Sequence, residues 1–162
     1  MTLQELALEV PNRPGALAGV ARILAKERIN VAAISVDSNA RRGHVRLVLS
    51  DPKRARTLLA AAGFRVETHE LIAVRLEDRT GSFLQVLDAL ANAKVNIQSV
   101  AILVVREGGH SLVGISSDEL PKARLALRQG GFISETAERL ISNRDLLAAA
   151  PAIPQESVGL LL

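Results

Sequence analysis

Two short glycine-containing loops carry the residues best suited to hold a small molecule. The first spans Asn12 to Gly15 (NRPG) and the second spans Asp78 to Gly81 (DRTG), and an apolar helix pattern follows each. Glycine lets a backbone approach a ligand closely, and the start of a helix presents unpaired N–H groups and the positive end of the helix dipole. A ligand carboxylate would gain charge-assisted hydrogen bonds there, worth about 1.5–3 kcal/mol each. A glycine that serves only the turn would give the same pattern, so the loops alone leave both interpretations open.

Two asparagines strengthen the case for a ligand. Asn30 and Asn96 each stand between two aliphatic residues at the start of a predicted strand. An amide offers donors and an acceptor together, which suits the two charged groups of an α-amino acid. Asparagine is also a favoured turn residue between a helix and a strand, so a purely structural role stays open.

Two histidines recur in register but do not indicate catalysis. His44 and His110 each follow a turn glycine, and neither has a carboxylate or hydroxyl partner at a matched position. We therefore expect them to be exposed strand residues. The sequence contains no phosphate-binding glycine loop, nucleophile elbow or metal-ligand spacing, and no cysteine. These features predict a binding protein rather than an enzyme, and no cofactor or metal.

Both loops belong to an internal duplication, which is the strongest signal in the sequence. Gly15 and Gly81 lie 66 residues apart. The same spacing relates the pairs Val20/Val86, Leu24/Leu90, Ala25/Ala91, Asn30/Asn96, Gly43/Gly109, His44/His110 and Ser50/Ser116. The second copy is then two residues longer, so that Gly63-Phe64 matches Gly131-Phe132. One fixed spacing that holds through several kinds of element is not expected by chance.

Each copy shows the same order of predicted elements. Alternating apolar residues predict opening strands, and helical spacing predicts the helix after each loop. Asp51-Pro52 and Ser117-Asp118 are helix starts, and Gly63 and Gly130 are helix ends. In the two copies, we expect opening strands at 6–10 and 72–76, helices at 17–24 and 83–90, strands at 31–36 and 97–105, return strands at 44–50 and 110–116, helices at 52–62 and 119–129, and closing strands at 64–71 and 132–137.

This βαββαβ order predicts an α+β protein made of two tandem ferredoxin-like units, in which each antiparallel sheet has strand order 4-1-3-2 and helices on one face. Strand 2 lies at an edge, where an unpaired strand invites a partner. The two sheets could join edge to edge into one eight-stranded sheet, within one chain or between chains. We expect a first domain at 1–70, a second at 71–137 and a C-terminal extension at 138–162. No flexible linker separates the copies, so we expect them to pack rigidly.

Composition excludes several classes of protein. Of the 162 residues, 48% are hydrophobic and 23% charged, which is typical of a folded globular chain with an aliphatic core, since only 2% are aromatic. The net charge is +3, but the basic residues are scattered and no aromatic residues lie among them, so we expect no nucleic-acid binding. We find no signal peptide and no apolar run long enough to span a membrane. A cytoplasmic location is the expectation.

The sequence resembles the ACT-domain family of small βαββαβ regulatory modules, which commonly bind amino acids. Residues Leu8 to Leu17 (LEVPNRPGAL), followed by Ile29-Asn30-Val31, match the family pattern of a strand, an N-R-P-G turn, a helix and an I-N-I strand start. The resemblance covers about residues 3–137, and the chain is similar to stand-alone tandem ACT proteins of bacteria. It implies a regulatory homo-oligomer, expected to be a dimer, that binds an amino acid and acts on a partner enzyme or regulator of unknown identity.

The resemblance also implies which residues hold the ligand. In the first copy these are Asn12, Arg13, Pro14, Gly15, Ala16, Leu17, Asn30 and Val31; in the second they are Asp78, Thr80, Gly81, Ser82, Phe83, Asn96 and Ile97. The second loop departs from the pattern, because it replaces Asn12 with a carboxylate and Pro14 with a less rigid residue. We therefore expect the first loop to be the better ligand site. The alternative is a structural module that assembles through its sheet edges without a ligand.

Overall fold

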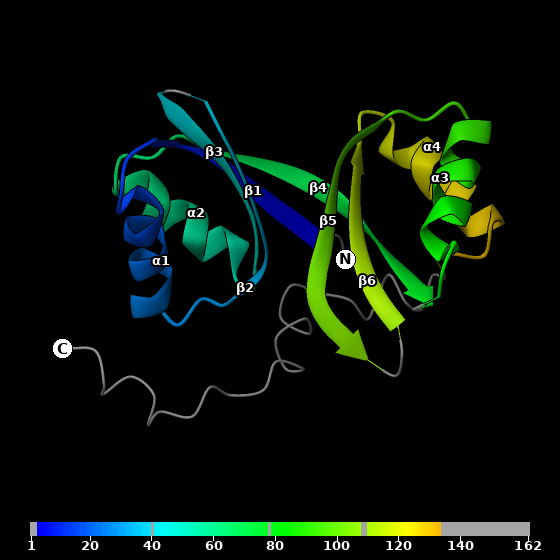
Figure 1. The fold of residues 1–162 in the computed structure, drawn as a ribbon, viewed down its shortest axis with the longest axis horizontal. Helices are drawn as coiled ribbons and strands as arrows, with labels where there is room; N and C mark the ends of the chain where they lie inside the picture. The colour runs from blue at the N-terminus through cyan, green and yellow to red at the C-terminus, as the bar shows by residue number, and fades with distance from the viewer. Residues whose placement is uncertain (1–2, 40, 78, 108–109, 134–162) are drawn as a thin grey trace.

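The computed structural model describes residues 3–39, 41–77, 79–107 and 110–133 (Figure 1). Asp78, the end of the last expected closing strand and the expected extension at 138–162 lie outside the described residues. The elements are, in chain order, β1 (Leu3–Pro11), α1 (Ala16–Lys26), β2 (Val31–Ser38), β3 (Arg42–Leu49), α2 (Pro52–Ala61), β4 (Val66–Glu77), α3 (Ser82–Asn92), β5 (Ile97–Glu107), β6 (His110–Ser117) and α4 (Leu120–Gln129).

The strands form one antiparallel, six-stranded sheet in the order β2-β3-β1-β4-β6-β5. The first module, read from β4 to β2, has the predicted order 4-1-3-2. The second module continues from β4 through β6 to β5. Below, "first module" means β1 to the start of β4 and "second module" means the rest of β4 to α4.

The sheet has six strands in the described residues, rather than the expected eight, for two reasons: β4 serves both modules, and the described part of the last expected closing strand, residues 132–133, is not a strand. Strand β4 closes the first module and opens the second: Leu71 pairs with Leu3 of β1, and the next residue, Ile72, pairs with Ile115 of β6. The modules are therefore joined through one 12-residue strand. They are not joined by pairing of their edge strands, since β2 and β5 lie at opposite ends of the strand order.

The alternation of side chains along β4 explains why all four described helices lie on the same face of the sheet. Successive strand residues point to opposite faces. Val66 packs in the core beneath α1 and α2, Glu70 forms an ion pair with Arg124 of α4 at 2.9 Å, and Ile72 packs beneath α3 and α4. These residues share one face because they are separated by even numbers of positions, so the alternation of the two copies is in phase across the junction. The predicted single helical face is confirmed.

Three aliphatic clusters hold the protein together. One lies between α1, α2 and the first module's strands, and an equivalent one lies in the second module. The third lies on the sheet face without helices and joins the modules; its buried members are Leu3, Ala32, Ala33, Val48, Leu71, Leu103 and Leu112. Figure 1 shows the two helix pairs on opposite outer sides of the molecule, with β2 and β5 near each other between them. The sheet is therefore strongly curled.

Local signals at helix ends are largely as predicted. The Asp51 carboxylate accepts a hydrogen bond from the Arg54 N–H at 3.1 Å, which caps α2. Helix α2 ends before Gly63, which has a left-handed φ of 89°. In the second copy α4 ends with Gly130 as its C-cap, as predicted, and the left-handed residue is the next one, Gly131, with φ 76°. Among the described residues, no helix is long and apolar enough to cross a membrane.

Candidate functional site

The first loop leads directly into a helix, as its sequence predicts. Gly15 adopts a left-handed φ of 83° immediately before α1, and no side chain caps that helix. A Cβ built on Gly15 would meet nothing within 4 Å, so the space beside the loop is open. Arg13 and Pro14 are exposed, and Leu17 is 36% exposed. An open, uncapped helix start of this kind can bind an anionic group.

Asn12 ties the loop to the turn at the far end of β2. Its Nδ2 donates to the Asn39 carbonyl oxygen at 2.7 Å, and its backbone N–H donates to the Arg41 carbonyl oxygen at 3.1 Å. Asn39 in turn accepts from the backbone N–H groups of Arg41 and Arg42. The Asn12 amide therefore shapes the loop and fixes its place beside the end of β2.

Asn30 is anchored through its backbone and leaves its side chain exposed. Its N–H donates to Ser50 Oγ at 3.1 Å, and its carbonyl oxygen accepts from the Ser50 N–H at 3.1 Å. The side-chain amide of Asn30 makes no hydrogen bond to any other described residue. Val31 beside it is 42% exposed. The pair presents a free amide and an apolar side chain at the start of an edge strand.

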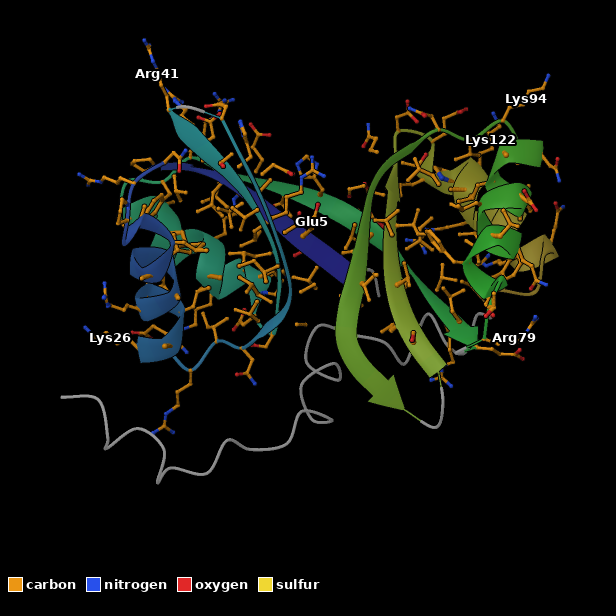
Figure 2. The ribbon with its side chains drawn as sticks, in the orientation of Figure 1. Glu5, Lys26, Arg41, Arg79, Lys94 and Lys122 are labelled. Carbon is orange, nitrogen blue, oxygen red and sulfur yellow. The ribbon has the colours of Figure 1, made fainter. Side chains whose placement is uncertain are left out.

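The loop and the asparagine of one module lie at opposite ends of a helix. Gly15 precedes α1 and Asn30 follows it, and a helix of 11 residues is about 16 Å long. The second module repeats this: Figure 2 shows Arg79 and Lys94 at opposite ends of α3. A small molecule therefore cannot touch the loop and the asparagine of the same module at once.

The second loop has the same backbone and a small cavity beside it. Gly81 has φ 89° and α3 lacks a side-chain cap. Ser82, which stands where the first copy has Ala16, is 6% exposed, and its hydroxyl has no hydrogen-bond partner among the described residues. Ser82 and Arg79 line a cavity of about 190 Å³ with Gly130 and Phe132. An unpaired buried hydroxyl is costly and points to a missing partner.

The other residues expected around the second loop are exposed or half-buried. Thr80 is exposed, Phe83 is 39% exposed, Asn96 is exposed and Ile97 is half-buried. Arg79 is held by Glu77, whose Oε2 accepts from Arg79 Nε at 2.6 Å. The second loop thus has a cavity and, among the described residues, a hydroxyl without a partner. The prediction that the first loop is the better ligand site did not take these features into account.

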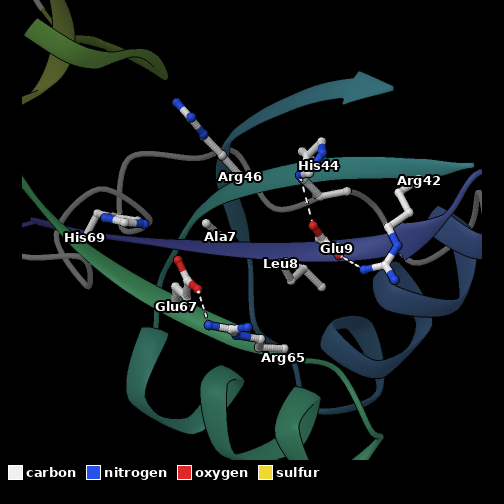
Figure 3. Close-up of a pocket in the computed structure, with 10 residues that line it drawn as sticks. Ala7, Leu8, Glu9, Arg42, His44, Arg46, Arg65, Glu67 and His69 are labelled. Carbon is white, nitrogen blue, oxygen red and sulfur yellow. Dashed lines mark hydrogen bonds and ion pairs between the residues drawn. The ribbon is translucent and has the colours of Figure 1, made fainter. Parts of the chain in front are cut away.

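His44 lies on the helix-free face of the first module, beside a shallow cavity of about 570 Å³ (Figure 3). Its Nδ1 is 3.6 Å from Glu9 Oε1, and it is exposed, as predicted. A hydrogen bond from Arg42 lowers the pKa of Glu9, and this carboxylate is already paired with the Arg42 guanidinium. Among the described residues no group of three or more histidine or acidic side chains could hold a metal ion. The exposure of the His110 side chain lies outside the described features.

Sequence reasoning missed three polar residues on the same face, Glu5, Arg46 and Ser99, which line a further cavity between β2 and β5. A signal was present, because each occupies a position where the other copy has an apolar residue. The alternation pattern identified only which strand face they would share.

Comparison with known proteins is decisive for the family. The family model described as an ACT domain pair matches residues 1–140. The chain belongs to the ACT domain pair family. ACT domains are regulatory modules rather than catalytic ones, and they generally bind small molecules such as amino acids. No curated protein matches the sequence significantly.

Solved structures share the architecture of this ACT pair. Protein BT0572 from Bacteroides thetaiotaomicron has a TM-score of 0.76 and 25% sequence identity, over 90% of this chain and 96% of that one. The ligand-free regulatory subunit of aspartate kinase from Thermus thermophilus has a TM-score of 0.58 and 17% identity, over 80% and 92%. The corresponding subunit from Thermus flavus has a TM-score of 0.56 and 18% identity, over 81% and 94%. The aspartate kinase subunits show the fold alone.

Proposed function

We propose that this ACT pair is a regulatory protein that binds an amino acid and acts on a partner enzyme or regulator. The observation that carries the proposal is the repeated loop geometry: in both modules a left-handed glycine opens onto an uncapped helix start. The ligand carboxylate would bind the free N–H groups there, and the Asn30 or Asn96 amide would bind its ammonium group or side chain.

The separation of loop and asparagine within a module supports a site shared between two copies of the chain. Asn12 fixes the first loop beside the end of β2. A second β2 strand laid antiparallel along the first would bring its own start, and with it the partner subunit's Asn30, to this loop. The outer edge of β2 has no strand partner in the described residues, and Val31 and Val36 are exposed along it. Such a homodimer would form an edge-to-edge sheet between chains.

Regulation would follow from this arrangement. A ligand that spans two copies binds the dimer more tightly than the monomer, so it shifts the population toward one arrangement. A partner enzyme or regulator that contacts only that arrangement would then respond to the amino acid concentration. The aspartate kinase subunits that share this fold are themselves named as regulatory.

Titration calorimetry of the full chain against each of the twenty amino acids tests the proposal. We expect at least one to bind, and Asn30→Ala to weaken it by roughly tenfold or more, because a hydrogen bond to a charged group is lost. Asn92→Ala is the matched control, since Asn92 is an exposed amide at the end of α3, and it should leave binding unchanged.

Binding heat from none of the twenty would refute amino-acid binding. If the chain nevertheless dimerised to the same extent with and without them, it would be an interaction module that assembles through its sheet edges. The exposed apolar residues on the edge strands, among them Ile34 at 54% and Ile102 at 73%, are the observation that keeps this second function in view.

A further inference from the structure

A cavity of about 260 Å³ lies between the two modules, away from both glycine loops. Edge strands β2 and β5 border it, and Glu5 of β1 and Arg46 of β3 also line it. Figure 2 shows Glu5 between the modules, on the opposite side of the sheet from the helices. Because residues from both modules line the cavity, whatever fills it contacts both.

Glu5 is an acidic residue in an unusual place. It is only 4% exposed, and its Oε2 accepts a long hydrogen bond of 3.4 Å from Ser99 Oγ. Ser99 Oγ is 2.6 Å from the buried Ser116 hydroxyl. No cationic side chain among the described residues forms an ion pair with Glu5. Burial raises the pKa of Glu5, although Arg46 and His69 partly offset this. A buried carboxylate without a close cation is costly and leaves acceptor capacity free.

Arg46 brings a positive group to the same cavity. Figure 3 shows Arg46 extending from β3 away from the sheet, whereas dashed lines join Arg42 to Glu9 and Arg65 to Glu67. Arg46 makes no ion pair or hydrogen bond to another described side chain. It is nevertheless the cation that contributes most to lowering the pKa of Glu5. One anion and one cation, neither with an ion-pair partner among the described residues, therefore flank a single cavity.

Comparison of the two copies shows that these polar residues are not required by the fold. The residues equivalent to Glu5 and Arg46 at the 66-residue spacing are Leu71 and Leu112, and both pack in the apolar cluster that joins the modules. The residue equivalent to Ser99 is Ala33, in the same cluster. The duplicated backbone thus accepts apolar residues at all three positions. Replacing a buried charged group with an apolar residue is often neutral or stabilising, so packing gives no reason for the charge of Glu5.

We infer that the inter-module cavity is a second ligand site, which takes a small zwitterion such as a free α-amino acid. The ligand's ammonium group would lie against the Glu5 carboxylate and Ser99 hydroxyl, and its carboxylate would lie against the Arg46 guanidinium. The volume suits a ligand of few atoms, since drug-sized pockets begin at about 300 Å³. Because β2 and β5 both contact the ligand, binding would fix the distance between the modules and couple this site to the edge strands.

Amide chemical shifts of the ¹⁵N-labelled full chain test the inference, with each of the twenty amino acids as probe and propylamine and propionate as single-charge probes. We expect one or more amino acids to shift the amides of Ala33, Arg46 and Ser99. Glu5→Gln and Arg46→Gln should each raise the amino-acid concentration needed for half-maximal shifts by roughly tenfold, since each removes one charged contact. Arg46 is exposed, so its variant should fold even if the Glu5 variant does not.

Two controls separate this site from the loop site. Glu67→Gln removes an exposed carboxylate of the same sheet face, and Asn30→Ala removes a loop-site amide; both should leave the cavity shifts unchanged. The inference would be overturned if none of the amino acids shifted the cavity amides, or if neither Glu5→Gln nor Arg46→Gln affected those shifts. Propylamine or propionate binding as tightly as every amino acid would also overturn it. If amino acids shifted the cavity amides but not the amides of Gly15 and Gly81, that result would count against the loop site only.

Discussion

At the scale of single residues, Glu5 couples the stability of the fold to pH. Its pKa is raised above the ordinary value of 4.5, chiefly by burial, while Arg46 of β3, His69 of β4 and Ser99 of β5 oppose the shift. A raised pKa means that the folded state binds the proton more tightly than the unfolded state. This stabilisation is complete below the unfolded pKa and is lost as the pH rises through the folded pKa. The free energy of unfolding should therefore fall, relative to Glu5→Gln, as the pH rises above 4.5.

Urea denaturation of both proteins between about pH 4 and pH 8 measures this difference. Comparison with Glu5→Gln largely removes the contributions of the other ionisable groups, because both proteins contain them. Glu67→Gln is the control, since Glu67 is exposed and pairs with Arg65 at 3.3 Å, so it should show no such fall. A difference that stays constant or grows in the opposite direction would contradict the burial of an ionisable Glu5.

The residue scale also shows where sequence reasoning stops. The left-handed conformation of Gly15 and Gly81 was predictable, because a glycine between a strand and a helix has a local cause. The partner of Asn12 was not, because Asn39 lies 27 residues further along the chain and meets it only after β2 and β3 have formed. The burial of Glu5 beside Ser99, 94 residues away, depends in the same way on how the modules meet.

At the scale of elements, β4 is the feature that the repeat could not reveal. The two copies predict a closing strand to Leu71 and an opening strand from Ile72, and the pattern contains no turn residue between them. Because the apolar alternation of both stretches is in phase, a single strand satisfies both sheets. Periodicity predicted each half correctly, but only the pairing with β1 and β6 shows that they are one element.

The junction of β4 with β6 predicts a sensitive position at Gly114. A Cβ built there would lie 2.8 Å from Leu71 Cδ1 and 3.4 Å from Leu71 Cβ, and Leu71 is completely buried. Gly114→Ala should therefore overpack the cluster between the modules and lower the free energy of unfolding by about 1–3 kcal/mol. Combining it with Leu71→Val, which shortens the obstructing side chain, should cost less than the sum of the two single changes. Urea denaturation of the three variants measures this coupling.

Gly19→Ala is the control for this change. Gly19 lies within α1, and a Cβ there meets nothing within 4 Å. Alanine should raise stability by about 0.5–1 kcal/mol at a helical position of this kind. If Gly114→Ala lowered the free energy of unfolding no more than Gly19→Ala, the result would contradict the close packing of β6 on Leu71.

At the scale of the whole molecule, the duplication predicted two similar modules but not how they face each other. Helix and strand order within a module follow from short-range patterns, and these were predicted. The curl that brings β2 near β5 depends on the cluster containing Leu3, Leu71 and Leu103, which come from distant parts of the chain. The exposed edges were predicted from strand order. The cavity between them could not be predicted in this way, because it exists only in the curled sheet.

The edge of β2 gives the last prediction, which concerns assembly. If two copies pair along β2 to complete the loop site, a charge on that edge should separate them, because an inserted lysine is a common device against edge pairing. Val36 is 45% exposed on β2 and does not line the inter-module cavity. We expect the full chain to have the mass of a dimer by light scattering, and Val36→Lys to raise its dissociation constant by roughly tenfold or more. Leu125→Lys, at a 57% exposed position on α4, should leave the dimer intact. A wild-type chain that stays monomeric with and without its amino acid would exclude the shared site, because the loop and Asn30 of one module are a helix apart.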